Sequence, residues 1–577
     1  MPGARGLTRP LVVGRRFVIH GLTRLTVRVA RLLADELAEV VVVAAERDRD
    51  MATTLGEGAR VVWVGTSLAE AFEEAGLAGA QGLLLLGEDD RENLHAAVVA
   101  HALAPAIPIV LRTFNPALED QLERSLNLRR AYSVSQLAAP AFVAAALGEE
   151  MVQTMHLGGD EVTLCRVLVG KGSPLTGATT DDLEERFHVS LLARAGSDGP
   201  WEPATGEERV AGGDTILVGG PIDEVFALAA QDHTIFGGRE RPPRSRVRGR
   251  RRRAAPSRPG ARATMLPVAA AILGLVLISA GITFAVARGL NPLEAAYFTV
   301  TTAFGEETLG PGETGLKAVG ILTAVAGAAL AAVLFGHLAS VATAQRLEER
   351  AERRAGRLSG HVVVAGLGTV GYRVASRLAD VGIDVAAVER SPDPRFHRPL
   401  AQRMPLLTGD VLMPESLDRA GVSRAVSFLA CTDDDVANVL ACLHARRDNP
   451  RIRTVARIFD EDLAERAGTA FGIDVVLSTT RLSADAFGSA ATDERAPRRF
   501  ALGPIVYLML REDMDEGEEL TRERIHAWEG EGLHLLAFRR GSGDAQPPSS
   551  LSASLREGDS AVFAGPEATV RSILLSE

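Results

Sequence analysis

Three glycines and one acid are spaced in a way that could bind a dinucleotide. Gly366, Gly368 and Gly371 follow the apolar run 361–365 and open an amphipathic stretch, and Glu389 ends the next apolar run. In such a turn the first glycine allows the tight bend, the second lets a phosphate approach the backbone, and the third lets helix and strand pack closely. The helix amides would hold the phosphate, and the acid would accept ribose hydroxyls. The spacing predicts a nucleotide site, with a glycine turn that holds no ligand as the alternative.

The frame around these residues occurs twice, at a shift of 345 residues. Gly21 then matches Gly366, and the run ending at Asn93 matches the run ending at Asn438. The other matching pairs are Arg112 with Arg457, Phe114 with Phe459, Leu118 with Leu463, Phe142 with Phe487, and Asp214 with Asp559. Each copy alternates short apolar runs with amphipathic stretches, which is typical of a parallel sheet covered by helices, and a smaller β-rich unit follows. We therefore expect a duplicated cytoplasmic unit.

The first copy departs from the glycine pattern. Thr23 and Thr26 stand where the second copy has its second and third glycines. A side chain at the first of these positions would occupy the space where a phosphate approaches the backbone. Glu46 is expected to keep the place of the ribose acid. The first copy is therefore predicted to be structural or to bind a different ligand.

Two apolar segments lie between the copies. Residues 265–287 carry no charge, and in residues 318–345 only His337 can ionise. Each is long enough to cross a hydrocarbon core of about 30 Å, so we predict two membrane spans; a buried alanine-rich core helix is the alternative for the second. Eleven arginines in residues 238–262 place both chain ends in the cytoplasm. A nucleic-acid patch or a contact with anionic lipid is the alternative for this run.

Composition narrows the class of protein. The 577 residues are 46% hydrophobic and 24% charged, which favours several folded domains over a disordered chain. The net charge of -11 argues against a general nucleic-acid-binding protein. Three cysteines without metal-ligand spacing indicate a reducing compartment, no disulfide framework and no metal site. The N-terminus lacks the apolar core of a signal peptide, so we expect the chain to start in the cytoplasm.

The second copy resembles the regulator-of-potassium-conductance (RCK) domain, also called the KTN domain. The matching runs are GLGTVG at 366–371, VER at 388–390, TGD at 408–410, TDDDVAN at 432–438 and ARIFDEDL at 456–463. The β-rich units resemble the C-terminal ligand subdomain of the same family. The resemblance implies an α/β protein with two Rossmann-like RCK domains, each with a small α+β C-terminal subdomain, flanking a two-helix transmembrane pore hairpin.

The resemblance sets the expected boundaries. Residues 1–150 and 359–497 would form the Rossmann-like domains, 151–236 and 498–577 their subdomains, 237–264 a flexible linker, 265–345 the hairpin, and 346–358 a charged helical link. In this family the nucleotide-binding fold takes an adenine nucleotide such as NAD(H), ADP or ATP. The residues implied for binding are Gly366, Leu367, Gly368, Thr369, Val370, Gly371, Glu389, Arg390, Asp410, Thr432 and Arg457.

The hairpin resembles a two-span potassium channel. The residues in place of the selectivity filter are Thr301, Thr302, Ala303, Phe304, Gly305, Glu306 and Glu307. Compared with the T-V-G-Y-G filter, this run has lost one glycine, which removes a layer of carbonyl coordination for potassium. Rings of Glu306, Glu307 and Glu313 in a tetramer would attract monovalent or divalent cations. An ordinary solvated acidic loop is the alternative.

Together these features predict a cation channel of the plasma (inner) membrane, potassium-channel-like but non-selective or divalent-permeable, gated by adenine nucleotide. It would be a multi-pass homotetramer with both termini cytoplasmic, eight RCK folds in one ring, contact with membrane lipid, and no nucleic-acid partner. The alternative is a non-conducting, membrane-anchored regulator of a separate transporter. A third hypothesis, an NAD-dependent enzyme, is disfavoured because no base, nucleophile or metal cluster accompanies the glycine turn; we expect no catalytic residue.

Overall fold

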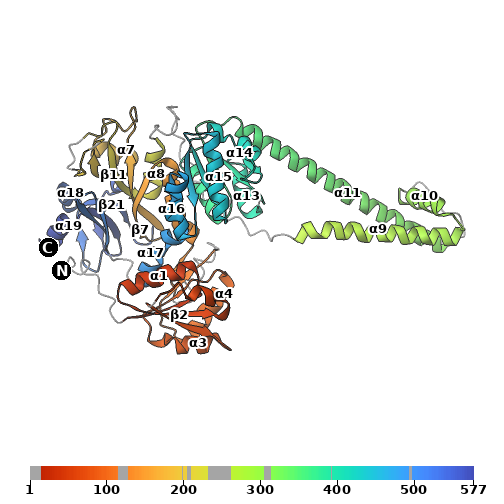
Figure 1. Ribbon diagram of the computed structural model, residues 1–577, viewed down its shortest axis with the longest axis horizontal. Helices are drawn as coiled ribbons and strands as arrows, with labels where there is room; N and C mark the ends of the chain where they lie inside the picture. Colours follow the sequence, from red (N-terminus) through yellow and green to blue (C-terminus); the bar gives the residue numbers. More distant parts are fainter. Residues whose placement is uncertain are drawn as a thin grey trace. The chain divides into compact units, whose positions relative to one another are not determined.

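The computed structural model describes residues 15–56, 58–114, 128–197, 199–204, 209–231, 261–304, 314–391, 393–492 and 497–576. It divides into two compact units (Figure 1). One unit comprises Met1–Arg244 with Arg354–Glu577, and the other comprises Ser245–Arg353.

The larger unit contains two parallel six-stranded sheets with the same strand order. The first has the order β3-β2-β1-β4-β5-β6, and the second has the order β14-β13-β12-β15-β16-β17. The strands of the first sheet are β1 (Arg16–His20), β2 (Glu39–Ala45), β3 (Ala59–Val64), β4 (Gly82–Leu85), β5 (Ile109–Arg112) and β6 (Leu128–Tyr132). Those of the second are β12 (Val362–Ala365), β13 (Val385–Glu389), β14 (Leu406–Thr408), β15 (Ser427–Ala430), β16 (Arg453–Arg457) and β17 (Val475–Leu477). The central strands are buried on both faces, as the apolar runs require.

Helices connect these parallel strands. In the first copy they are α1 (Arg24–Asp35), α2 (Arg49–Ala52), α3 (Leu68–Glu74), α4 (Asp90–Leu103) and α6 (Val134–Leu147). In the second they are α12 (Thr369–Asp380), α13 (Pro394–Ala401), α14 (Pro414–Ala420), α15 (Asp435–Asp448), α16 (Glu461–Phe471) and α17 (Thr479–Ala491). The last helix of each copy packs on the first helix of the other, α6 on α12 and α17 on α1, so the two copies share their cores.

A small antiparallel subdomain follows each sheet. The first contains β7 (Glu150–Leu157), β8 (Asp160–Leu168), α7 (Thr180–Phe187), β9 (Ser190–Ala195), β10 (Glu202–Pro203), β11 (Thr215–Pro221) and α8 (Ile222–Gln231). The second contains β18 (Arg498–Leu502), β19 (Ile505–Asp513), β20 (Glu519–Leu520), α18 (Arg522–Gly530), β21 (His534–Arg539), β22 (Leu555–Arg556), β23 (Ser560–Pro566) and α19 (Glu567–Ser576). A single apolar core that includes Leu192 and Tyr507 joins the two subdomains. Ser190 Oγ also donates to the Leu535 carbonyl at 2.7 Å.

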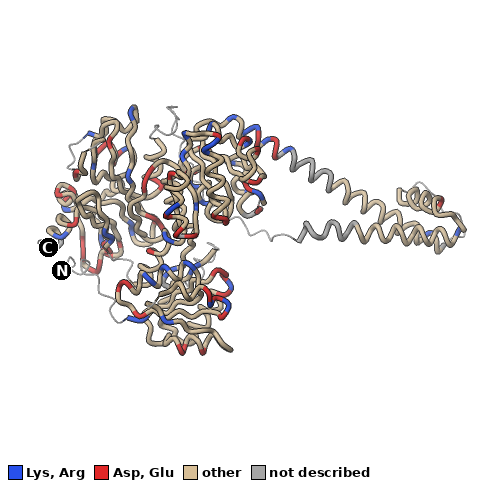
Figure 2. Tube along the Cα trace, viewed as in Figure 1, with Lys and Arg blue, Asp and Glu red and all other residues tan. Residues whose placement is uncertain are grey.

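The described residues of the smaller unit form α9 (Ala261–Arg288), α10 (Pro292–Ala303) and all but the last two residues of α11 (Thr314–Ala355). Residues 271–288 and 315–336 within α9 and α11 are long and apolar enough to cross a membrane, and few of these side chains are buried. Figure 2 shows these stretches free of acidic and basic residues over most of their length, with charge returning near the C-terminal end of α11. Phe284 and Phe298 pack edge to face at 4.9 Å and hold α10 against α9.

The structure confirms the predicted α/β class with two Rossmann-like sheets and two apolar helices between them. Among the expected filter residues, Thr301, Thr302 and Ala303 form the last turn of α10, and Phe304 is its C-cap. Gly305, Glu306, Glu307 and Glu313 lie outside the described residues. Their proposed role in ion passage stays a prediction.

Candidate nucleotide site

The glycine turn of the second copy is built by close backbone contacts. Gly366 has φ +90°, and its N–H donates to the Val388 carbonyl at 2.8 Å. A Cβ atom at Gly366 would lie 2.9 Å from the Thr432 backbone nitrogen. A Cβ atom at Gly371 would overlap the Gly366 carbonyl oxygen. These two glycines are therefore required by the fold itself.

Gly368 is different, because its environment does not require a glycine. A Cβ atom there would meet no protein atom within 4 Å. Gly368 is the N-cap of α12, and among the described residues no side chain caps the helix. The first amides of α12 are therefore available to a ligand, and the positive end of the helix dipole favours an anion.

The acids of the second copy lie beside this turn. Glu389 ends β13, and its two carboxylate oxygens accept the N–H groups of Leu367 at 2.7 Å and Ser391 at 2.8 Å. The carboxylate is thereby held in place at the edge of the turn, and each oxygen keeps a lone pair for a further donor. Asp410 accepts the Leu412 N–H at 2.9 Å and lies 3.9 Å from the exposed Arg390 guanidinium.

Thr432 and Arg457 meet on the other side of the turn through Asn438. The Asn438 side chain accepts the Thr432 hydroxyl at 2.7 Å and donates to the Arg457 carbonyl at 2.9 Å. The Arg457 guanidinium stacks over Phe459 with its carbon 4.1 Å from the ring centre. Burial lowers the pKa of the Arg457 guanidinium. Cys431, Asp433 and Asp435 oppose this shift without reversing it. A partly buried cation beside the turn can therefore meet an anionic ligand.

A cavity of about 540 Å³ opens between these residues and the first copy. This volume falls in the range of sites for small molecules and cofactors. The second copy lines it with Thr369, Val370, Asp433, Asp434, Asp435, Val436, Arg457, Phe459, Thr479 and Thr480. The first copy contributes Arg24, Leu25, Met51, Glu88, Arg112, Phe114, Val134 and Ser135. The cavity thus joins the start of α12 to three arginines, two of which come from the first copy.

The corresponding turn of the first copy is closed by its threonines. Gly21 keeps the positive φ of +86°. The Thr23 hydroxyl accepts the Thr26 N–H at 3.2 Å and so caps α1. The Thr26 hydroxyl donates to the Gly21 carbonyl at 2.6 Å. The protein itself therefore satisfies the position where a phosphate would bind in the second copy.

The first copy also lacks the ribose acid, contrary to the expectation for Glu46. The strands of the two copies align without a gap: Leu37 and its equivalent Gly382 both have positive φ. The Gly21 N–H donates to the Val43 carbonyl, as the Gly366 N–H donates to the Val388 carbonyl. In this register the fully buried Ala44 occupies the position in the first copy that Glu389 occupies in the second. Glu46 instead lies in the short helix after β2, where its carboxylate pairs with the Arg49 guanidinium at 3.0 Å.

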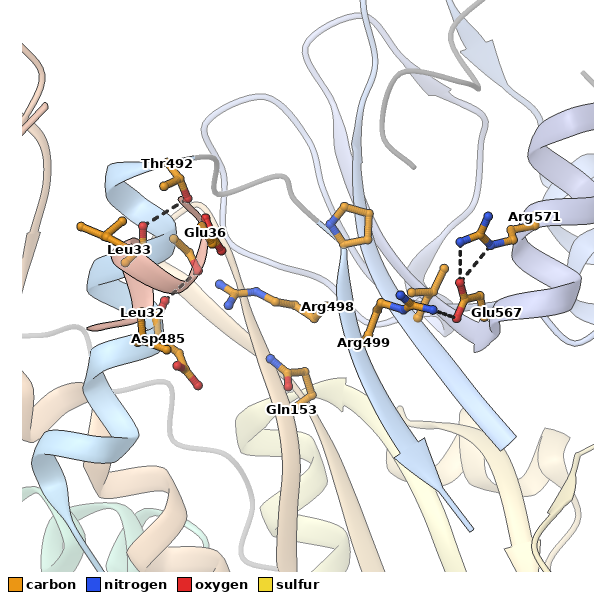
Figure 3. Close-up of a pocket in the computed structure, with 14 residues that line it drawn as sticks. Leu32, Leu33, Glu36, Gln153, Asp485, Thr492, Arg498, Arg499, Glu567 and Arg571 are labelled. Atoms are coloured by element: carbon orange, nitrogen blue, oxygen red, sulfur yellow. Dashed lines mark hydrogen bonds and ion pairs between the residues drawn. The ribbon is translucent and has the colours of Figure 1, made fainter. Parts of the chain in front are cut away.

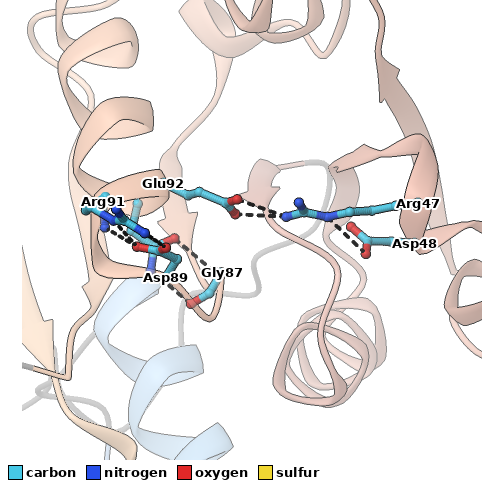
Figure 4. Close-up of polar contacts among 7 residues, drawn as sticks. Arg47, Asp48, Gly87, Asp89, Arg91 and Glu92 are labelled. Carbon is cyan, nitrogen blue, oxygen red and sulfur yellow. Dashed lines mark hydrogen bonds and ion pairs between the residues drawn. The ribbon is translucent and has the colours of Figure 1, made fainter. Parts of the chain in front are cut away.

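Ion pairs occupy the rest of this edge in the first copy (Figure 4). Arg47 makes a two-pronged contact with Glu92, at 2.9 and 3.1 Å, and also approaches Asp48. Asp89 holds Arg91 in the first turn of α4. Ala437 stands where the first copy has Glu92, so no equivalent of this bridge forms in the second copy. The edge that is open in one copy is bridged by charge in the other.

A family model described as the TrkA-N domain matches residues 17–133 and 362–479. The chain carries two TrkA-N domains. Their limits coincide with the two parallel sheets, and the predicted two-domain arrangement around two apolar helices is thereby confirmed. The second TrkA-N domain holds the open turn and the acid, and the first holds the capped turn.

Curated relatives match parts of these domains. The chain is 29% identical over 187 residues to the Trk system potassium uptake protein TrkA of Mycobacterium tuberculosis, covering 31% of this chain and 77% of the relative. It is 33% identical over 102 residues to a TrkA homolog of Pyrococcus abyssi, covering 17% of this chain and 44% of the relative. A similar match of 34% identity, to a homolog of Pyrococcus horikoshii, also covers 44% of the relative. The chain thus spans less than half the length of these two Pyrococcus relatives.

Solved structures resemble the whole chain at low identity. The GsuK channel aligns at a TM-score of 0.49 with 15% identity, covering 99% of this chain and 81% of the other. The crystal structure of the GsuK RCK domain aligns at 0.48 with 14% identity, covering 99% and 97%. Likeness at this level does not support a conclusion about function.

The structure brings the predicted residues to one edge of the second TrkA-N domain, with Thr369, Val370 and Arg457 in the cavity wall. Arg390 is exposed, and its guanidinium lies 3.9 Å from the Asp410 carboxylate. Sequence reasoning missed Arg24, which reaches this cavity from the first copy, and Asn438, which links Thr432 to Arg457. The repeat could have found Asn438, because Asn93 makes the same contacts with Gly87 and Arg112.

Proposed function

We propose that the second TrkA-N domain binds an adenine nucleotide, NAD(H), ADP or ATP, and that this binding controls cation movement across the membrane. The observation that carries the proposal is the uncapped start of α12 after Gly368, whose first residues Thr369 and Val370 line a cavity of about 540 Å³. A helix N-terminus without a side-chain cap, behind a glycine that no protein contact requires, is suited to a phosphate group.

Each residue of the second copy has a role in this proposal. The amides of Thr369 and Val370 would donate to phosphate oxygens. Glu389, fixed by two backbone N–H groups, would accept ribose hydroxyls through its remaining lone pairs. Arg457 would balance the phosphate charge, and Asp410 and Thr432 would border the sugar.

We propose that the regulated process is potassium transport. The curated relatives carry the name of the Trk potassium uptake system. In this chain the second TrkA-N domain follows α11, one unbroken helix from Thr314 to Ala355 that contains the second candidate span. A continuous helix resists bending, so a movement of the domain would reach the span. A homotetramer of such chains, with eight folds in a ring, would surround one cation pathway in the plasma membrane.

A non-conducting regulator of a separate transporter is the second candidate function. It is favoured by the relatives' names, which refer to an uptake system, and by the filter region with one glycine fewer than T-V-G-Y-G. We propose ligand sensing without turnover in either case. A stable absorbance of NADH incubated with the protein is the expected result, and its decay would indicate an enzyme.

Purified full-length protein in liposomes tests the proposal. Isothermal calorimetry with NADH, ADP and ATP in turn should find binding by at least one of them. Potassium or rubidium flux should then change on addition of that nucleotide. Binding without flux in any condition would support the regulator instead of the channel. The absence of binding by all three would contradict the proposed nucleotide site.

A further inference from the structure

Helix α12 connects the proposed nucleotide site to the C-terminal subdomain of the other copy. Its first turn faces the cavity, and its last turn carries Arg377. Between them, Val374 and Leu378 are fully buried in a core that also contains α6, β8 and α8 of the first copy. The helix therefore packs against the first copy along most of its length. Closely packed interiors of this kind transmit displacement.

An ion pair closes the far end of this contact. Arg377 donates to Glu161 of β8 at 2.7 Å, and the side chains are 25% and 6% exposed. Burial raises the pKa of Asp223, which lies in the first turn of α8. Arg377 is near enough to oppose this rise, and the neighbouring acids Asp380, Glu161 and Asp160 add to it. The Arg377 guanidinium thus pairs with an acid on β8 and lies near a second acid on α8. A buried pair of this kind holds its partners at a fixed distance and is costly to break.

The repeat offers a natural comparison, because the same contact is absent on the other side. At the shift of 345 residues, Leu32 of α1 is the equivalent of Arg377, and Val506 of β19 is the equivalent of Glu161. The strand pairs agree in register, with Leu157 opposite Asp160 in one copy and Leu502 opposite Ile505 in the other. No ion pair can form between leucine and valine.

A polar cavity of about 420 Å³ lies where the apolar core is expected on that side (Figure 3). Its lining residues Leu33, Gly488, Thr492, Glu567 and Arg571 stand at the positions of Leu378, Val143, Leu147, Ile222 and Phe226, which are buried in the core of the first side. Arg499 and Arg571 both pair with Glu567 at the cavity wall. One interface is apolar at these positions and ends at an ion pair, and its counterpart holds a cavity with polar side chains in its wall.

We infer that nucleotide held by the second TrkA-N domain acts on the C-terminal subdomain of the first copy, through α12 and the Arg377–Glu161 pair. The C-terminal subdomain of the second copy faces the capped first domain across the hollow interface and receives little of this effect. The inference rests on the proposed nucleotide site. It makes Arg377 and Glu161 positioning residues that do not touch the ligand.

Hydrogen exchange of the full chain in nanodiscs, with and without the nucleotide that calorimetry selects from NADH, ADP and ATP, measures this effect. Amides in β8 and α8 should slow by about fivefold or more, the lower end of typical coupling, and those in β19 and α19 should change less. The double variant Arg377→Leu with Glu161→Val installs the residues of the other copy and removes both members of the ion pair, so that neither is left without its partner. It should keep nucleotide affinity within about twofold and lose the slowing in β8 and α8.

The matched control is Arg403→Leu, which removes an arginine that pairs with Asp380 at the end of the same helix, outside the β8 contact. This variant should keep both affinity and slowing. Equal slowing in β8 and β19 of the wild type, or slowing that survives in the double variant, would overturn the inference while leaving the nucleotide site intact. Failure of all three nucleotides to bind the wild type would overturn the proposed function and the inference together.

Discussion

The two TrkA-N domains share one fold and differ at the few atoms that meet a ligand. Both have a glycine with positive φ after the first strand, and in both an asparagine links two neighbouring strand ends. In the first domain Thr23 caps the helix and Ala44 stands at the acid position. In the second domain Gly368 leaves the helix uncapped and Glu389 borders the turn. Duplication thus preserved the framework, and the residues at two equivalent positions, Thr23 or Gly368 and Ala44 or Glu389, separate a filled turn from an open one.

The hydrogen bonds of the first domain show how a turn can lose its ligand without losing its shape. The Thr23 hydroxyl accepts from an amide of α1, where a phosphate oxygen would accept in the second domain. The Arg47–Glu92 pair then bridges the short helix after β2 and the first turn of α4. A domain that supplies its own acceptors gains stability and gives up binding.

The largest expected effect comes from giving the second turn the closed character of the first. Gly368→Asp should lower nucleotide affinity by more than about 100-fold, because the carboxylate would cap α12 and repel phosphate. The fold should survive, since a Cβ atom there meets no protein atom. Thr23→Asp is the matched control and should leave affinity unchanged. Calorimetry measures both, and equal losses would remove the distinction between the domains.

A stability difference should separate the third positions of the two turns. Gly371→Ala places a methyl group on the Gly366 carbonyl and should destabilise the second domain by about 3 kcal/mol. Thr26→Ala removes the hydrogen bonds of the hydroxyl to the Gly21 carbonyl and to the Thr23 hydroxyl, and should cost the first domain about 1–2 kcal/mol. Thermal unfolding of the two variants checks the order. A larger loss for Thr26→Ala would mean that the first turn is the more constrained of the two.

The first domain should still assist binding in the second. Arg24 is exposed and lines the cavity that Thr369 also lines. Arg24→Ala should weaken nucleotide binding by about three- to tenfold, in line with loss of one partly screened charge contact. Arg28→Ala, on the same helix and outside the cavity lining, serves as the control. Identical affinities of the two variants and the wild type would confine the site to the second domain.

The smallest effect is expected where the copies remain alike. Glu184 of α7 and Glu529 of α18 are equivalent in the repeat. Burial, followed by Glu529, raises the pKa of Glu184 to about 7, and burial also raises the pKa of Glu529. A carboxyl with a raised folded pKa stabilises the protein at low pH, and this contribution is lost as pH rises through about 7.

Glu184→Gln should therefore raise the melting temperature by a few degrees at pH 8 and by less at pH 5. Glu185→Gln, on the exposed side of the same helix, is the control. A melting temperature of Glu184→Gln that exceeds the wild type equally at both pH values would show that charge at Glu184 does not govern this contact.

The sequence was sufficient to predict the repeat and the sheets, because apolar runs and a constant shift are local patterns. It misplaced the acid of the first copy. Glu46 is the nearest acid in the sequence, but the strand register makes Ala44 the equivalent of Glu389. A register depends on hydrogen bonds between strands, and a shift of two residues keeps the same alternation of faces.

The shared cavity was not predicted, because it depends on which helix of one copy packs on the other. The exchange of α6 and α17 brings Arg24 and Thr369, far apart in the sequence, to one cavity. Local patterns specify each sheet and leave such pairings open. The same limit applies to Arg377 and Glu161, whose types alone suggest ordinary surface charges.

The stoichiometry of nucleotide binding tests the central claim most directly. Calorimetric titration of the purified full-length protein, with chain concentration determined independently, counts the nucleotides bound by each chain. The open second turn and the capped first turn predict one nucleotide per chain, reduced to none by Gly368→Asp. Two nucleotides per chain, or one that survives Gly368→Asp, would contradict the assignment of the site to the second TrkA-N domain.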